Sequence, residues 1–398
     1  MKRISKLTAL LLSAALLLAL AACGPAASNP SSPADKTDAP AGNSAPADKT
    51  DAPTSSGDSY TLGYNNFGQG AYPLDLNESV TKYALECMGM QMVSVNNQFT
   101  VDKLITDAQN QITQGVDGMV FWSAADTLFK PFSDLCSQTK TPFALGDKYP
   151  QSEDTKAMLR ENPYFAGAIS TDDHAIGVKM AELALADGHK TVVMIGAAVG
   201  DINHDLRLAG FTEAFTAGGG EVLGEFHCAD PSEAVQKAND AMTAYPDVDC
   251  VFGSGGDYSQ GLLSALESIG RAGELPIYGV DIDPNVIAGI RNGTIRAAAG
   301  ACGPYCAGIA GALLVNYLDG HPILDENGQA PMTNGINAIF VDSENVDDYE
   351  ENWITNQAFS PEEYQALLYR NNPNVTWKDY QELIDNYNFE SRMAAKKG

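Results

Sequence analysis

The sequence predicts an α/β protein made of two doubly wound lobes, each built on a parallel sheet. From Tyr60 onward, short apolar runs alternate with longer amphipathic segments, a pattern typical of parallel strands covered by helices on both faces. About ten strands are expected, which is more than one such sheet comfortably holds. The 398 residues leave room for two or three domains.

Segments with the periodicity of a helix lie between most of the expected strands. Val101, Leu104 and Ala108 step by three or four residues, as do Val178 and Ala181. The expected strands are Thr61–Tyr64, Gln91–Val95, Gly118–Phe121, Phe143–Gly146, Ala166–Ser170, Thr191–Ile195, Val222–Phe226, Cys250–Gly253, Ile277–Val280 and Arg296–Ala299.

The composition excludes several classes of function. The chain has 51 Asp and Glu against 24 Lys and Arg, a net charge of −27. No basic cluster is present to neutralise phosphates, so nucleic acid is not expected as a partner. Seven cysteines are too few for a disulfide scaffold. No two histidines have metal-ligand spacing, so we expect neither a metal nor a cofactor.

The first 23 residues have the layout of an export signal. Lys2, Arg3 and Lys6 precede an apolar run that ends in Leu20-Ala-Ala-Cys23. This ending resembles the bacterial lipobox, which implies cleavage before Cys23 and a diacylglycerol on its sulfur. An ordinary signal peptide is the alternative. Cleavage would remove three cations and take the net charge to −30.

Residues 24–59 are predicted to be a flexible tether. They consist mainly of Pro, Ala, Ser, Asp, Thr and Gly, and the stretch Pro33–Pro40 recurs at Pro46–Pro53. So few large apolar side chains cannot bury a core. A flexible chain of this length reaches roughly 30–36 Å, so the globular part would work just outside the membrane.

Polar and aromatic residues gather where the expected strands end, the edge at which doubly wound sheets bind ligands. Amides, carboxylates, one guanidinium and several flat rings are present there. This inventory suits a polar ligand with apolar faces. The segments are Asn65-Asn66-Phe67, Trp122-Ser123, Asp147-Lys148, His204 to Arg207, Gly255 to Tyr258 and Asp281 to Asp283.

The ordered set of motifs resembles the type I periplasmic solute-binding proteins, near the ribose/galactose-binding group of sugar ABC transporters. The resemblance spans about residues 60–341 and implies two lobes joined by three crossovers near Ser170, Ala301 and Phe340. It also implies a ligand held between the lobes. The matching stretches are Tyr60–Phe67, Ile112–Val120, Arg207–Phe211, Tyr278–Asp283 and Gly303–Gly308.

The same resemblance implies roles for individual residues. Arg207 matches an arginine that grips ring oxygens, and Asp281 matches a carboxylate after a strand. Cys302 stands where relatives often have an amide. The candidate ligand-binding residues are Asn65, Asn66, Phe67, Tyr72, Trp122, Asp147, Lys148, His204, Arg207, Asp257, Tyr258, Asp281 and Cys302.

The tail is longer than this family pattern requires. Ser360-Pro-Glu-Glu363 reads as a capping box that opens a helix to about Tyr369, and Thr376–Tyr387 reads as another. Its aromatic residues predict docking onto a lobe, with a partner-binding arm as the alternative.

These observations predict a lipid-anchored, monomeric, extracytoplasmic solute-binding protein. It would deliver a sugar-like ligand to an ABC permease and would not be an enzyme. A ligand sensor for a receptor and a secreted carbohydrate hydrolase are the alternatives. The expected parts are the signal peptide (1–22), the tether (23–59), an N-terminal lobe (60–169 and 303–339), a C-terminal lobe (170–302 and 340–352) and a helical extension (353–398).

Overall fold

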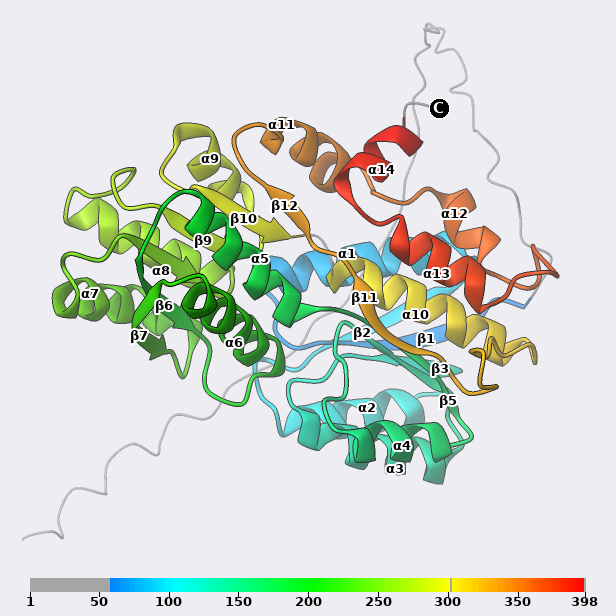
Figure 1. Cartoon of the computed structure of the whole chain (residues 1–398). Helices are drawn as coiled ribbons and strands as arrows, with labels where there is room; N and C mark the ends of the chain where they lie inside the picture. Colours follow the sequence, from blue (N-terminus) through cyan, green and yellow to red (C-terminus); the bar gives the residue numbers. More distant parts are fainter. Residues whose placement is uncertain (1–57, 301–302, 397–398) are drawn as a thin grey trace, which may run out of the picture. The chain divides into compact units, whose positions relative to one another are not determined.

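Two six-stranded sheets organise the molecule (Figure 1). The computed structural model describes residues 58–300 and 303–396, so Cys23, Cys302 and the tether up to residue 57 lie outside the described residues. The first sheet has the order β11-β5-β4-β3-β1-β2 and the second the order β12-β10-β9-β8-β6-β7. The two orders correspond strand by strand, so the lobes repeat one plan.

All ten expected strands are present, with ends that differ by at most two residues. The first lobe contains β1 (Thr61–Asn66), β2 (Gln91–Asn96), β3 (Gly118–Phe121), β4 (Phe143–Gly146), β5 (Phe165–Thr171) and β11 (Met332–Ile336). The second contains β6 (Thr191–Gly196), β7 (Glu221–His227), β8 (Cys250–Gly253), β9 (Ile277–Val280), β10 (Ala297–Gly300) and β12 (Ile339–Val341).

The two strands that the sequence did not predict are both at sheet edges. β11 pairs with β5 in parallel, whereas β12 pairs with β10 in the antiparallel direction. The second sheet is therefore mixed, which is common for an edge strand of a doubly wound sheet. The described chain passes between the sheets after β5, between β10 and α10, and between β11 and β12.

Helices cover both faces of each sheet. In the first lobe α1 (Tyr72–Cys87) and α10 (Gly303–Leu318) pack together on one face. The helices α2 (Lys103–Thr113), α3 (Phe129–Thr139) and α4 (Glu153–Glu161) lie on the other (Figure 1). In the second lobe α5 (Asp173–Ala186) pairs with α6 (Ile202–Ala217), and α7 (Ala234–Ala244) pairs with α8 (Gly256–Ser268), which contacts α9 (Pro284–Asn292).

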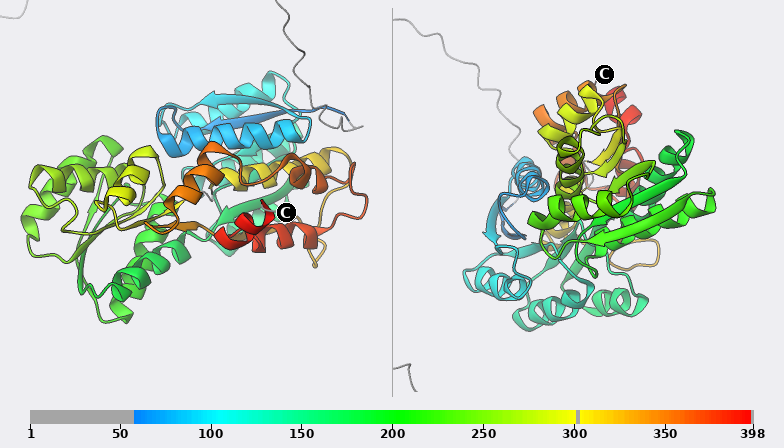
Figure 2. Two further views of the ribbon diagram at one scale, coloured as in Figure 1. Left: turned by 90° about the horizontal axis from the view of Figure 1, so that it is seen from above. Right: turned by 90° about the vertical axis from the view of Figure 1, so that its left-hand side faces the viewer.

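The tail beyond β12 docks as expected, and Figure 2 shows its helices lying against the rest of the fold. The docked side includes buried aromatic side chains. Its elements are α11 (Val346–Tyr349), a π-helical turn (Glu350–Thr355), α12 (Pro361–Ala366), α13 (Trp377–Asp385) and α14 (Phe389–Ala395). The Ser360–Glu363 capping box is present, although its helix ends three residues earlier than expected, at Ala366. Tyr364, Tyr380 and Tyr387 are fully buried, so the docked arrangement, and not a free arm, is what the structure shows.

No helix among residues 58–300 and 303–396 has the length and apolarity to cross a membrane.

Candidate functional site

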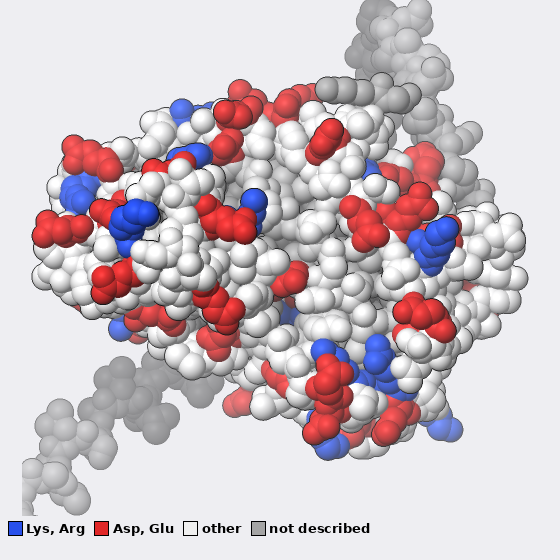
Figure 3. Space-filling model, in the orientation of Figure 1, with Lys and Arg blue, Asp and Glu red and all other residues white. Residues whose placement is uncertain are grey.

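A cavity of about 420 Å³ lies between the lobes, at the carboxyl ends of the central strands. We call it the cleft. Both lobes contribute to its lining, and so does the tail through Tyr349. This is the position at which doubly wound sheets present loops to a ligand. Acidic side chains are spread over both lobes on the face shown in Figure 3.

Two aspartates occupy equivalent places in the two lobes. Asp147 follows β4 and Asp281 follows β9, and these are the third strands of their sheets. Their φ angles are 70° and 65°, in the left-handed region that non-glycine residues adopt only at a cost. Each backbone N–H is held by the neighbouring strand, from Asp147 to Ile169 (2.9 Å) and from Asp281 to Ala299 (2.7 Å). The fold therefore fixes both carboxylates in the cleft.

Asp147 is buried and accepts hydrogen bonds from two side chains. Trp122 Nε1 donates to its Oδ2 over 3.1 Å and Asn77 Nδ2 over 3.4 Å. Burial raises the pKa of Asp147 to about 6, against the lowering effect of the Lys148 ammonium. The carboxylate is thus ionised at neutral pH and keeps acceptor capacity for a ligand.

Lys148 joins the lobes across the cleft. Its Nζ lies 3.8 Å from Asp201 Oδ1 in the second lobe and 4.5 Å from the centre of the Trp122 ring. Asp201 also caps α6 by accepting from the backbone N–H of Asn203 and His204. Burial alone would raise the pKa of Asp201, but Lys148 and His204 bring it below its usual value.

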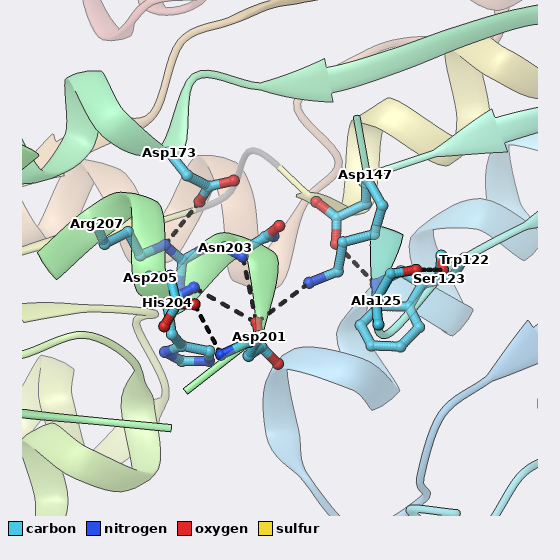
Figure 4. Close-up of polar contacts among 12 residues, drawn as sticks. Trp122, Ser123, Ala125, Asp147, Asp173, Asp201, Asn203, His204, Asp205 and Arg207 are labelled. Atoms are coloured by element: carbon cyan, nitrogen blue, oxygen red, sulfur yellow. Dashed lines mark hydrogen bonds and ion pairs between the residues drawn. The ribbon is translucent and has the colours of Figure 1, made fainter. Parts of the chain in front are cut away.

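Arg207 is held in a buried ion pair, which Figure 4 shows with the other polar contacts. Its Nε donates to Asp173 Oδ1 (2.7 Å) and its Nη1 to the carbonyl of Ser254 (2.9 Å). Its helix can reach Asp173 because α5 and α6 approach closely. A Cβ on Gly177 would lie 2.0 Å from the Arg207 carbonyl, and one on Gly210 would lie 2.1 Å from the His174 carbonyl.

His204 is a neutral hydrogen-bonding group at neutral pH. Its Nδ1 lies 2.8 Å from Ser254 Oγ, and the edge of its ring meets Tyr258 at 5.2 Å between ring centres. Burial lowers the pKa of His204 to about 4. Asp257, which also lines the cleft, occupies the first turn of α8. Burial and the nearby carboxylate of Asp281 raise the pKa of Asp257.

An aromatic wall lines the first lobe. Phe67 stacks on Trp122 with ring centres 5.1 Å apart, and Phe99 meets Phe67 edge-on at 5.8 Å. Tyr72, at the start of α1, also lines the cleft. Such flat faces pack against C–H groups of a ligand.

Two candidates, Asn65 and Asn66, are not among the residues that line the cleft. Asn65 Nδ2 donates to the Trp122 carbonyl and its Oδ1 accepts from the Trp122 N–H. Asn66 Nδ2 donates to Glu78 and its Oδ1 accepts from Gly68. The sequence placed both asparagines in a loop, but β1 continues through Asn66. Their amides therefore support the cleft wall from behind.

Ten candidates do line the cleft, namely Phe67, Tyr72, Trp122, Asp147, Lys148, His204, Arg207, Asp257, Tyr258 and Asp281. Sequence reasoning missed four residues that build the site: Asn77, Asp173, Asp201 and Tyr349. Asp201 carried a usable signal, because an aspartate just before a helix start is a common cap. The other three depend on tertiary packing and had no local signal.

Within the described residues, no group of three or more His, Cys, Asp or Glu side chains could hold a metal ion. Among the described cysteines, Cys87, Cys136, Cys228 and Cys250 are free thiols.

Comparison with known proteins bears directly on this architecture. The sequence profile of the periplasmic binding protein domain matches residues 59–322. Among curated proteins, none matches the chain significantly.

Solved structures of sugar-binding proteins share the fold at low identity. GanP, a glucose-galactose binding protein from Geobacillus stearothermophilus, is 19% identical, with a TM-score of 0.61 over 72% of this chain and 99% of its own. An ABC transporter solute-binding protein from Actinobacillus succinogenes with bound D-allose is 16% identical, with a TM-score of 0.64 over 73% and 100%. A periplasmic ribose ABC transporter protein from Conexibacter woesei is 20% identical, with a TM-score of 0.60 over 74% and 95%.

The profile covers most of the chain, and the two corresponding sheets give the same architecture as these structures. The chain belongs to the periplasmic binding protein family and has its type I fold.

Proposed function

We propose that this protein captures a sugar-like small molecule in the cleft and delivers it to an ABC permease from the outer face of the cell membrane. The observation that carries the proposal is the lining of the cleft. Two carboxylates in equivalent places, Asp147 and Asp281, face the same cavity as the Phe67–Trp122 aromatic wall.

The chemistry of that lining suits a polyhydroxylated ring. Asp147 and Asp281 can each accept hydrogen bonds from hydroxyl groups. Arg207, which Asp173 and the Ser254 carbonyl hold in place, lines the same cavity. Phe67 and Trp122 offer apolar surface to the C–H faces. Support comes from fold relatives that bind D-allose, arabinofuranose and myo-inositol.

Capture would involve closure of the lobes around the ligand. A ligand shifts a conformational equilibrium only through different affinities for its states. Contacts from Asp147 on one lobe and Asp281 on the other supply that difference, because both are made only when the lobes approach. Hinge closure of this kind is a common response to ligand binding.

We propose further that Cys23 carries a lipid anchor and that the protein acts as a monomer. The Leu20-Ala-Ala-Cys23 sequence motivates the anchor. Cys23→Ala is expected to release the protein from membranes or to block its processing, as measured by fractionation and by the mass of the mature chain. Normal cleavage with unchanged membrane retention would contradict the anchor.

The function is tested by thermal shift against a panel of sugars, polyols and nucleosides, because a ligand of the native state raises the melting temperature by mass action. We expect one or more neutral sugars to raise it. The binding role, and not the alternative of a secreted carbohydrate hydrolase, requires that the bound sugar be recovered chemically unchanged. Release of a hydrolysed product would contradict the proposal. A response only to non-sugar ligands would contradict the sugar class.

A further inference from the structure

After its third passage between the sheets, from β11 to β12, the chain crosses from one lobe to the other once more. We call residues 342–396 the C-terminal segment, and its first part is fixed to the second lobe. Arg291 on α9 donates to Asp347 over 2.8 Å and also pairs with Glu350. Arg296 pairs with Asp342 at 3.4 Å. The start of the segment is thus held by the lobe that contains β12.

The later part of the segment is fixed to the first lobe. Asn316 on α10 donates from Nδ2 to the Leu367 carbonyl over 2.8 Å. Arg370 Nε donates to Asp319 Oδ2 over 2.8 Å, and both side chains of this pair are largely buried. In addition, α12 packs on α1 and α13 on β11. Between its two attachments the segment crosses from one lobe to the other.

An aromatic cluster occupies the crossing point. Trp353, 2% exposed, stacks on Tyr349 and on Phe389 with ring centres 5.6 Å and 5.2 Å apart. Its Nε1 donates to the Tyr387 hydroxyl over 3.2 Å. Tyr387 in turn packs against Tyr305 of α10 at 5.3 Å. Rings from both attachments therefore form one packed unit.

This cluster reaches the cleft. Tyr349 is fully buried and lines the cavity, as does Pro304, the neighbour of Tyr305. A Cβ on Gly300 would lie 3.1 Å from Tyr349 Oη, so the tyrosine lies directly against the end of β10. Tyr349 lies beyond residue 322, where the match to the family profile ends.

We propose that the C-terminal segment is a fourth connection between the lobes, which restrains their opening. The proposal rests on the proposed function only in treating the cleft as the binding site. Opening the lobes would move Arg291 relative to Asp319, so the packed rings of the Trp353 cluster between them would have to separate. The packing of that cluster thus favours the arrangement of the lobes seen here.

The experiment uses the free thiol of Cys228, which lines the cleft and is 1% exposed, as a reporter of opening without any ligand. The full-length mature protein is treated with N-ethylmaleimide, and the labelling rate of each cysteine is measured by peptide mass spectrometry. Cys136 and Cys250 are fully buried within the lobes, and their rates report unfolding. The variant is Trp353→Ala, and the matched control is Trp377→Ala, a buried tryptophan of the same segment that stacks on Tyr380 instead.

We expect Trp353→Ala to label Cys228 about tenfold faster, because it removes two stacked aromatic contacts. Cys136 and Cys250 should keep their rates, and Trp377→Ala should leave the Cys228 rate within about twofold of wild type. Arg291→Gln removes only the exposed ion pairs of the first attachment, so it should increase the labelling rate of Cys228 roughly two- to fivefold.

Three results would overturn the proposal. One is a Cys228 rate within twofold of wild type in both Trp353→Ala and Arg291→Gln. Another is an equal increase in the labelling rates of Cys136, Cys250 and Cys228 in both variants, which would mean that the segment only stabilises the fold. The third is equal acceleration of Cys228 in Trp377→Ala. Since no sugar is added, these results do not depend on whether the protein binds a sugar.

Discussion

Replacing Arg207 by alanine tests how the second lobe builds its side of the cleft. Arg207 and Asp173 are only 7% and 2% exposed, and their charged groups meet at 2.7 Å. Arg207→Ala leaves the Asp173 carboxylate buried without its cation. It also removes the hydrogen bond to the Ser254 carbonyl. The perturbation therefore acts on the fold as well as on the site.

Breaking a buried ion pair from one side costs about 3–5 kcal/mol, because the remaining charge stays desolvated. Ligand affinity should fall as well, by roughly 10- to 150-fold, the loss typical of a hydrogen bond to a charged group.

The assay is urea unfolding followed by circular dichroism, with calorimetric titration for affinity. Arg207→Ala should lose about 3–5 kcal/mol. The double variant Arg207→Ala/Asp173→Asn should recover part of that loss, because no uncompensated charge remains. Lys130→Ala is the control, since the Lys130–Asp134 pair is 2.8 Å long but exposed and should contribute at most about 1 kcal/mol. A loss under 1 kcal/mol in Arg207→Ala, or strictly additive effects in the double variant, would refute the reasoning.

Two further predictions follow from the geometry of the cleft. Ligand affinity should fall as pH is lowered through about 6, by up to tenfold per pH unit, because protonation of Asp147 removes an acceptor. Calorimetric titrations from pH 7.5 to 5 should show this fall in wild type. The same dependence of affinity on pH in Asp147→Asn would contradict the prediction. Gly177→Ala should destabilise the second lobe by about 1–3 kcal/mol, since its Cβ would lie 2.0 Å from the Arg207 carbonyl; an unchanged melting temperature would show that α5 and α6 can separate without cost.

The sequence predicted the strands well for a physical reason. In a parallel sheet covered on both faces, central strands must be continuous apolar runs, and those runs are visible locally. Residues 339–341 escaped prediction because the strand has only three residues, and residues 332–336 because β11 is partly polar and exposed. Their pairing is made by partners more than a hundred residues earlier or some forty residues away.

The sequence located cleft-lining residues where a side chain follows a strand end, and it missed residues that reach the cleft from elsewhere in the chain. Asp147 and Asp281 were found from their place after β4 and β9. Asn65 was assigned to a loop because the apolar run that marks the strand ends at Tyr64. In the structure β1 continues for two more residues, through Asn66. Asp173 and Tyr349 reach the site through α5 and the C-terminal segment, and no local pattern announces such long-range contacts.

The measurement that tests the central claim most directly is calorimetric titration of the full-length mature protein with neutral pentoses and hexoses, carried out in parallel on Asp281→Asn. We expect saturable one-to-one binding of one or more of these sugars to wild type. For that sugar, we expect affinity at least about tenfold weaker in Asp281→Asn, because the ligand hydroxyls lose a charged acceptor. No binding by any neutral sugar, or affinity within twofold of wild type in Asp281→Asn, would contradict a sugar site between the two lobes.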